Sequence, residues 1–198
     1  MSTADLVISG GTVVSPDCAI EASIAIADGL IVAVGSAAAM PPARETLDAR
    51  GLHVLPGAID VHVHFRDPGY PHKEDWQTGT AAAAFGGVTT VFDMPNTVPP
   101  TGTAAALADK HRIAAAGAHV DFGLYGLLGE DTIAHVSALV EGGVIGFKLY
   151  MGNTFGKIPC PSTGAMLEAF EVVAPTGKRV SLHAETNSIM ERREARMR

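Results

Sequence analysis

The chain has 198 residues, of which 47% are hydrophobic, and its formal net charge is −7. This composition predicts a globular protein with a packed core and excludes a disordered chain. The negative charge, without a stripe of Lys and Arg, argues against binding to nucleic acid, whose phosphates require a basic surface. No apolar run approaches the roughly 18 residues that span a bilayer, so we expect no membrane segment and a cytoplasmic location.

The two cysteines, Cys18 and Cys160, are far apart in the sequence and lie outside any Cys-x-x-Cys spacing. This arrangement indicates neither a disulfide framework nor a cysteine-ligated zinc site. It is consistent with a reducing compartment.

Residues 1–55 have the pattern of short strands joined by tight turns. β-Branched runs over residues 6–9, 23–26 and 30–34 are separated by Gly-rich and Asp-Gly turns, and Asp28-Gly29 suits a two-residue hairpin. A further short strand is expected around residues 51–55. We predict that residues 1–55 are the N-terminal part of a small β-sandwich domain.

Residues 56–198 alternate between strand and helix patterns. Expected strands are residues 58–63, 88–93, 120–125, 145–150 and 179–183, and expected helices are residues 79–85, 103–116, 132–141 and 165–173. Alternating βα units predict a parallel sheet, either doubly wound or closed as a barrel. A closed barrel needs eight strands, so we predict an α/β fold with a partial (β/α)8 barrel, five of whose eight βα units lie in this chain.

Chemically useful side chains lie at four of the five expected strand ends. His62 and His64 end the first strand, and their spacing of two puts both imidazoles on one face, as ligands of one metal require. Asn96 follows the second strand and His183 ends the fifth. Each signal is modest alone, but the carboxyl ends of barrel strands form one rim, where active sites of this fold lie.

Lys148 lies within the fourth strand, which is apolar on both sides of it. A buried lysine must be neutralised, paired or modified. Burial favours the neutral amine, which can form a carbamate whose two oxygens bridge two metal ions. Three imidazoles with such a lysine suit two divalent ions, zinc being the expected metal.

Three segments resemble the cyclic amidohydrolases, and among them the dihydroorotases: PGAIDVHVHFRDPG at 56–69, TGTAAAAFGGVTTV at 78–91 and DMPNT at 93–97. The segment GFKLYM at 146–151 is closer to allantoinases and hydantoinases. The resemblance implies that His62 and His64 bind the more buried metal ion, that carboxylated Lys148 bridges both ions and that His183 binds the second. It also implies that Arg66 and Asn96 hold the substrate.

The resemblance implies metal-dependent hydrolysis of a small cyclic amide, with dihydroorotate and N-carbamoyl-L-aspartate of pyrimidine biosynthesis as the expected pair. Allantoinase or hydantoinase/dihydropyrimidinase activity is the first alternative, and a non-catalytic scaffold relative is the second. No catalytic general base is identified in this span. We expect the general-base aspartate and a further histidine ligand to lie beyond Arg198. We also expect the 198-residue fragment alone to be inactive and poorly stable, and the full-length form to be a homo-oligomer.

Overall fold

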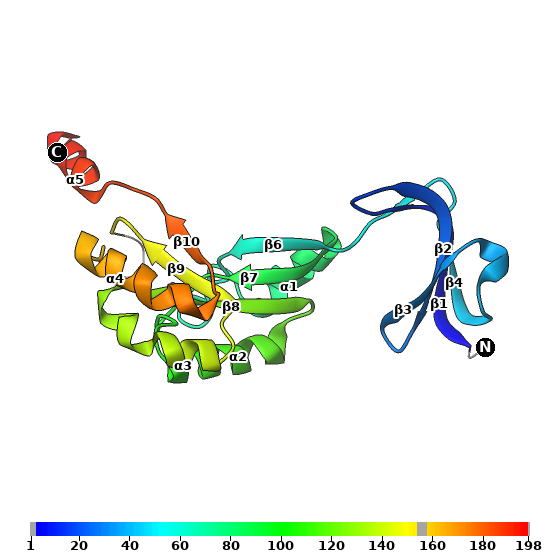
Figure 1. Cartoon of the computed structure of the whole chain (residues 1–198), viewed down its shortest axis with the longest axis horizontal. Helices are drawn as coiled ribbons and strands as arrows, with labels where there is room; N and C mark the ends of the chain where they lie inside the picture. The colour runs from blue at the N-terminus through cyan, green and yellow to red at the C-terminus, as the bar shows by residue number, and fades with distance from the viewer. Residues whose placement is uncertain (1–2, 154–157, 198) are drawn as a thin grey trace. The chain divides into compact units, whose positions relative to one another are not determined.

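The computed structural model describes residues 3–153 and 158–197, which form two compact units, Met1–Gly57 and Ala58–Arg198. Each unit contains its own sheet (Figure 1). None of the helices in the described part of the chain is long and apolar enough to cross a lipid bilayer.

The first unit is a mixed sheet of five strands in the order β3-β2-β1-β4, with β5 also paired to β1. Strands β1, β2 and β3 are antiparallel, whereas β4 and β5 run parallel to β1. The expected sandwich portion is thus a single mixed sheet in this structure. The strand bounds are β1 Ala4–Val14, β2 Ala19–Ala27, β3 Leu30–Gly35, β4 Ala43–Asp48 and β5 His53–Val54.

The predicted turn at Asp28-Gly29 is confirmed, because both residues have positive φ angles, 51° and 74°, between β2 and β3. Strand β4 was not anticipated. Its sequence, ARETLD, lacks β-branched alternation, and five of its six residues are exposed. Pairing with the long strand β1, rather than its own burial, therefore holds it in the sheet.

The second unit is a parallel sheet in the order β10-β9-β8-β7-β6. Neighbours in the sequence are neighbours in the sheet throughout, whereas a doubly wound sheet reverses its order at a switch point. The structure therefore selects the partial barrel over the doubly wound alternative. The strands are β6 Ala58–Val63, β7 Val88–Asp93, β8 Asp121–Leu128, β9 Gly146–Tyr150 and β10 Val180–His183.

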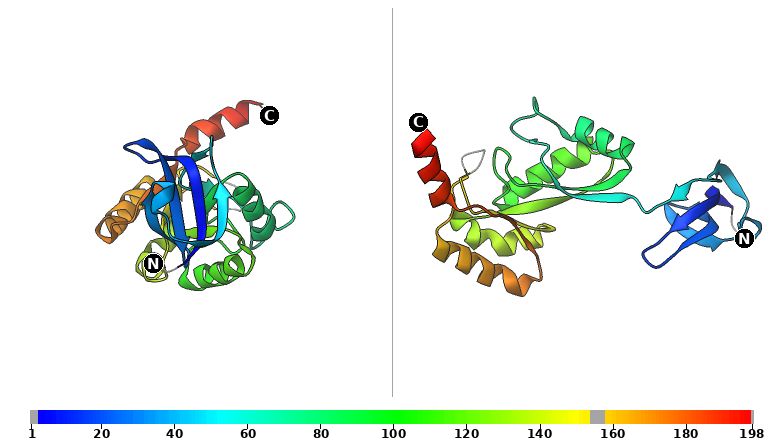
Figure 2. Two further views of the ribbon diagram at one scale, coloured as in Figure 1. Left: turned by 90° about the vertical axis from the view of Figure 1, so that its right-hand side faces the viewer. Right: turned by 90° about the horizontal axis from the view of Figure 1, so that it is seen from above.

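Helices α1 to α4 pack along one face of this sheet, while α5 projects away from it (Figures 1 and 2). Side chains of Asp75, Thr103 and Ser162 cap the N-termini of α1, α2 and α4 by accepting backbone N–H bonds. The helices are α1 Trp76–Phe85, α2 Ala104–Gly117, α3 Val136–Glu141, α4 Thr163–Val173 and α5 Asn187–Met197.

The helix expected over residues 132–141 is divided in the structure. Glu130–His135 forms a 3-10 turn and α3 follows it. The Thr132 hydroxyl donates to the carbonyl oxygen of Leu127 and accepts from the backbone N–H of Gly129. These local side-chain bonds compete with α-helical hydrogen bonding and favour the tighter turn.

A buried ion pair joins β7 to α2 within the apolar core of the second unit. Lys110 Nζ lies 2.5 Å from Asp93 Oδ2, and both side chains are 0% exposed. Lys110 also donates to the carbonyl oxygen of Met94 at 2.8 Å, and Asp93 Oδ1 accepts from the backbone N–H of Phe65 at 2.9 Å. Burial raises the pKa of Asp93, and the adjacent Lys110 ammonium opposes that shift.

We expect Lys110→Met to lower the free energy of unfolding of the full-length gene product by about 3–5 kcal/mol, because it leaves the Asp93 carboxylate buried without a counter-charge. The double variant Asp93→Asn with Lys110→Met should recover part of that loss. Denaturant titration measures both. Arg112→Met, which removes an exposed ion pair with Asp109 on the same helix, is the control and should cost less than about 1 kcal/mol. Equal losses for Lys110→Met and Arg112→Met would contradict the assignment.

Candidate metal centre

His62 and His64 lie together at the carboxyl end of β6. Their Nε2 atoms are 3.2 Å apart, and the ring centroids are 5.1 Å apart. The prediction that both imidazoles share one face is confirmed by this contact.

This spacing fits the distance between two ligands of one zinc ion. With Zn–N bonds of about 2.0–2.1 Å and tetrahedral angles, two ligand nitrogens lie about 3.3 Å apart. The 3.2 Å between the two Nε2 atoms matches that separation. The separation of the two nitrogens is therefore that of two ligands of one metal ion.

His64 has a second partner on the other side of its ring. Its Nδ1 lies 2.7 Å from Oδ1 of Asn96, which is 3% exposed in the loop that follows β7. The contact joins residues separated by 32 positions in the sequence. Asn96, which we expected to hold the substrate, is thus placed against a predicted metal ligand.

Burial favours the neutral form of both imidazoles, which is the form that binds a metal ion. Burial lowers the pKa of His64 from 6.5 to about 4, against the opposing effect of its Asn96 hydrogen bond. Burial also lowers the pKa of His62, and the nearby charge of Lys148 adds to this shift. With a pKa of about 4, the His64 ring is neutral near pH 7 and does not have to lose its extra proton before it binds a metal ion.

Lys148 is buried in β9, where it is 1% exposed. Its Nζ lies 5.2 Å from the ring centroid of Tyr150, two residues further along the same strand. Among the residues that the structure describes, the Lys148 side chain forms no hydrogen bond or ion pair, and burial lowers its pKa. The predicted burial of Lys148 is confirmed, whereas its carbamylation stays a prediction.

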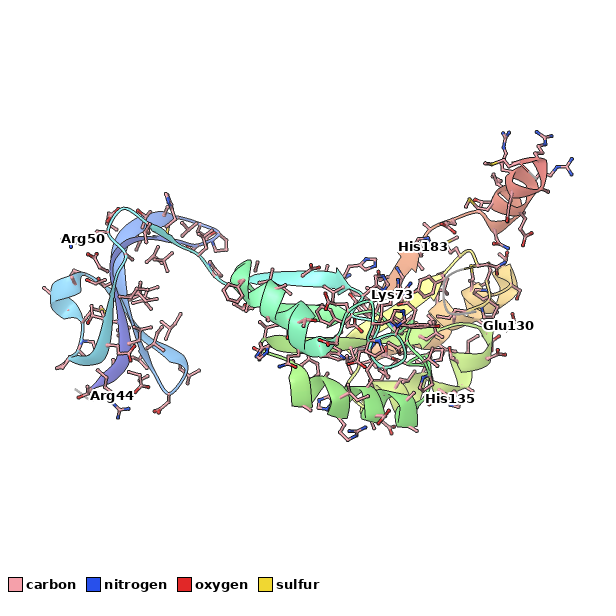
Figure 3. The ribbon with its side chains drawn as sticks, turned by 180° about the vertical axis from the view of Figure 1, so that it is seen from behind. Arg44, Arg50, Lys73, Glu130, His135 and His183 are labelled. Carbon is pink, nitrogen blue, oxygen red and sulfur yellow. The ribbon has the colours of Figure 1, made fainter. Side chains whose placement is uncertain are left out.

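His183 ends β10 at the same end of the sheet, where Figure 3 also shows Lys73 in the loop after β6 and Glu130 at the start of the 3-10 turn after β8. Its ring centroid is 6.0 Å from that of Tyr150, and its Nε2 is 2.7 Å from Oε1 of Glu185. Within residues 3–153 and 158–197, no three His, Cys, Asp or Glu side chains come close enough to hold one metal ion. His62 and His64 are paired, but His183 does not join them.

Arg66 follows β6 in a loop that is tied to the loop after β7. Its φ is +64°, in the left-handed region, and its charge lowers the pKa of His64 and that of Tyr150. The backbone N–H of Val98 donates to the carbonyl oxygen of Pro68 at 3.0 Å. Gly69 is required beside this bond, because its φ is +113° and a Cβ there would lie 2.6 Å from Val98 Cβ. The two loops hold Arg66 near His64.

Sequence reasoning missed four residues that shape this region: Asp93, Lys110, Tyr150 and Glu185. Lys110 had a signal, because it shares one buried face of α2 with Leu107 and Ala114 at helical spacing. Tyr150 also had one, since it is two residues from Lys148 on the same strand face. Its hydroxyl is buried and has no hydrogen-bond partner among the described residues.

A cavity of about 730 Å³ in the same unit lies beside this region rather than in it. Loops after β7, β8 and β9 line it, with Pro99, Leu127, Glu130, His135 and Cys160 in its wall. The described residues of the wall include none of the predicted metal or substrate ligands. We therefore locate the candidate chemistry at the His62–His64 pair.

The fold is a small β unit followed by five βα units of a parallel barrel, and comparison with known proteins gives the family. The model of the Amidohydrolase family matches residues 53–198. The chain belongs to the amidohydrolase family.

Similar proteins fall in the allantoinase, hydantoinase and dihydroorotase group. The chain is 41% identical over 191 residues to an allantoinase of Rubrobacter xylanophilus, covering 96% of this chain and 42% of that protein. It is 39% identical over 155 residues to a dihydroorotase of Methanosphaera stadtmanae, covering 77% of this chain and 34% of that protein. The chain thus spans about two-fifths of the length of such relatives.

A solved structure supports the same grouping. The L-hydantoinase (dihydropyrimidinase) from Arthrobacter aurescens superimposes with a TM-score of 0.93 at 31% identity, covering 98% of this chain and 44% of that one. This likeness confirms the predicted α/β class, with a small β domain followed by part of a (β/α)8 barrel.

We expect the free energy of unfolding of the metal-free protein to fall as the pH is lowered from about 6.5 to about 4. His64 has a depressed pKa in the folded state, so the unfolded chain binds the proton first and gains stability from it over this window. The slope from one histidine is at most about 1.4 kcal/mol per pH unit, and solvent screening reduces it because the ring is partly exposed.

Denaturant titrations at several pH values measure this slope. His64→Gln should flatten it between pH 6.5 and 4, whereas His135→Gln, which alters a histidine of the 3-10 turn before α3, should leave it unchanged. A His64→Gln slope equal to that of the wild type would contradict the assigned shift.

Proposed function

We propose that the protein containing this chain hydrolyses a C–N bond in a small cyclic amide at a metal centre built on His62, His64, Lys148 and His183. The observation that supports this most directly is the 3.2 Å separation of the His62 and His64 Nε2 atoms, which matches two ligands of one ion. Membership of the amidohydrolase family supports it independently.

Each residue has a separate task in this proposal. His62 and His64 supply neutral imidazole nitrogens to one ion. Burial lowers the pKa of the Lys148 amine and so favours its neutral form, which adds to carbon dioxide; an N–C bond forms, one amine proton is released, and the resulting carbamate carries a negative charge over two oxygens. Two divalent ions, zinc being the expected one, would lower the pKa of a bound water towards about 7 and polarise the ring carbonyl. His183 supplies a further ligand after it turns from Glu185.

In this proposal, Arg66 and the polar groups around it bind the substrate. A guanidinium can hold a carboxylate or a carbonyl oxygen with two parallel N–H bonds. The buried Tyr150 hydroxyl is a further candidate donor in this region, since the charge of Arg66 acts on it.

Allantoin is the first substrate that we propose. Relatives at 41%, 37% and 37% identity over nearly the whole chain carry the name allantoinase, and a further relative at 32% is an L-hydantoinase. Dihydroorotate, expected from the sequence, is supported less well by these comparisons. It is kept as the second candidate for one reason: a cation beside His64 suits a substrate with a carboxylate.

We expect the full-length gene product to hydrolyse allantoin with a higher kcat/KM than dihydroorotate or hydantoin, measured in parallel with each substrate. Faster turnover of dihydroorotate would transfer the assignment to the second candidate. Arg66→Gln distinguishes the two further. Loss of a charge-assisted hydrogen bond costs about 1.5–3 kcal/mol, which is about a 10- to 150-fold fall in kcat/KM. We expect this fall in kcat/KM mainly for dihydroorotate.

We expect Lys148→Arg to lower activity by about a hundredfold or more, because arginine cannot form the carbamate and the loss of metal-ion charge stabilisation costs several kcal/mol. Metal analysis should show less bound metal than in the wild type. Reconstitution of metal-free wild type should require both zinc and bicarbonate. Lys178→Arg, in the loop before β10, is the matched control and should behave as wild type. A wild-type protein that binds no divalent metal would support the non-catalytic alternative instead.

A further inference from the structure

The hydrogen bond between His64 and Asn96 determines more than the position of a loop. Asn96 Oδ1 can only accept a hydrogen bond, so at 2.7 Å the Nδ1 of His64 must be the donor. A neutral imidazole carries one N–H, so Nε2 then holds the lone pair. That lone pair lies on the side of the ring that contacts the Nε2 of His62, 3.2 Å away. Two nitrogens that bind one metal ion would have about this separation.

We propose that Asn96 is a positioning residue that selects the tautomer of His64, with its Oδ1 holding the Nδ1 proton so that Nε2 is the metal-binding nitrogen. The inference rests on the proposed metal centre and adds to it a role for a residue that the sequence assigned only to substrate. A metal-binding histidine generally donates the N–H of its other ring nitrogen to an acceptor in this way.

The surroundings of Asn96 explain how one amide can hold a ring in place. Asn96 is 3% exposed and lies two residues after Met94. The backbone N–H of Met94 donates to the carbonyl oxygen of Val63, and the carbonyl oxygen of Met94 accepts from Lys110. The loop is therefore anchored to β6 and α2 immediately before Asn96. An acceptor on an anchored loop costs little further conformational entropy to keep in place.

A substrate role and a positioning role for Asn96 predict different results for two variants. Asn96→Asp keeps an oxygen acceptor for the Nδ1 proton but loses the amide N–H donors. Asn96→Leu has a similar size and keeps neither. The positioning role requires that the two variants differ in metal affinity, whereas a substrate role alone requires that both raise KM at unchanged metal affinity.

The experiment measures zinc affinity of the full-length gene product by competition with a chromogenic chelator. We expect Asn96→Leu to weaken zinc binding about 10- to 100-fold and Asn96→Asp to restore it to within a fewfold of wild type. Thr97→Val is the loop control. Its hydroxyl is buried next to Asn96 and donates to the carbonyl oxygen of Pro99, but it does not contact His64. Zinc binding by Thr97→Val should equal that of wild type.

A second readout needs no metal. The ring ¹⁵N shifts of His64 in metal-free protein, assigned with His64→Gln, should show a protonated Nδ1 in wild type, Asn96→Asp and Thr97→Val, and a changed tautomer balance in Asn96→Leu. Wild-type zinc affinity and wild-type ring shifts in Asn96→Leu would overturn the inference, as would an equal loss of zinc in Thr97→Val. A wild-type protein that binds no zinc but has the expected Nδ1 proton would overturn the proposed function while supporting the tautomer assignment.

Discussion

The contact on which the rest of the second unit depends is the buried pair of Asp93 and Lys110. The Asp93 carboxylate accepts from the backbone N–H of Phe65, directly after His64, while Lys110 donates to the carbonyl oxygen of Met94, two residues before Asn96. One ion pair thus fixes the ends of β6 and β7 against α2. Removing two charges from water is costly, and that cost is offset only while every partner stays in place. The geometry between His64 and Asn96 follows from this requirement.

The strands of the second unit could be predicted well because their signal is local. β6, β7 and β10 begin and end within a residue of the expected positions, since each is a short segment containing apolar residues that follows a turn with Gly or Pro. β8 extends to Leu128, beyond the expected end, because its last residues pack into the core. Strand β4 and the 3-10 turn before α3 could not be predicted in the same way. Each depends on a partner, strand β1 for the first and the Thr132 hydroxyl for the second.

The candidate site also contains features that local sequence predicts and features that depend on contacts between elements. Strand periodicity alone places His62 beside His64, and an apolar run alone makes Lys148 buried. The contacts between elements were not foreseen, because Asn96 reaches His64 across 32 residues and Asp93 reaches Phe65 across 28. Such contacts are set by the register between two strands and the shape of the loops that follow them. A single sequence carries no direct signal for either.

The positions of the predicted ligands in the sheet explain why only two of them meet. His62 lies in β6 and His64 directly follows it, while His183 lies in β10, and these strands are the two edges of the described sheet. Lys148 lies on β9 beside β10. Apolar side chains of the edge strands are exposed, Ile59 at 57% and Leu182 at 43%, while every residue of β9 is buried. Exposed apolar edges are the surfaces that further pairing covers. In an eight-stranded barrel the first and fifth strands face one another across the interior, so His183 lies on the strand opposite the His62–His64 pair, and Lys148 lies on the strand next to it.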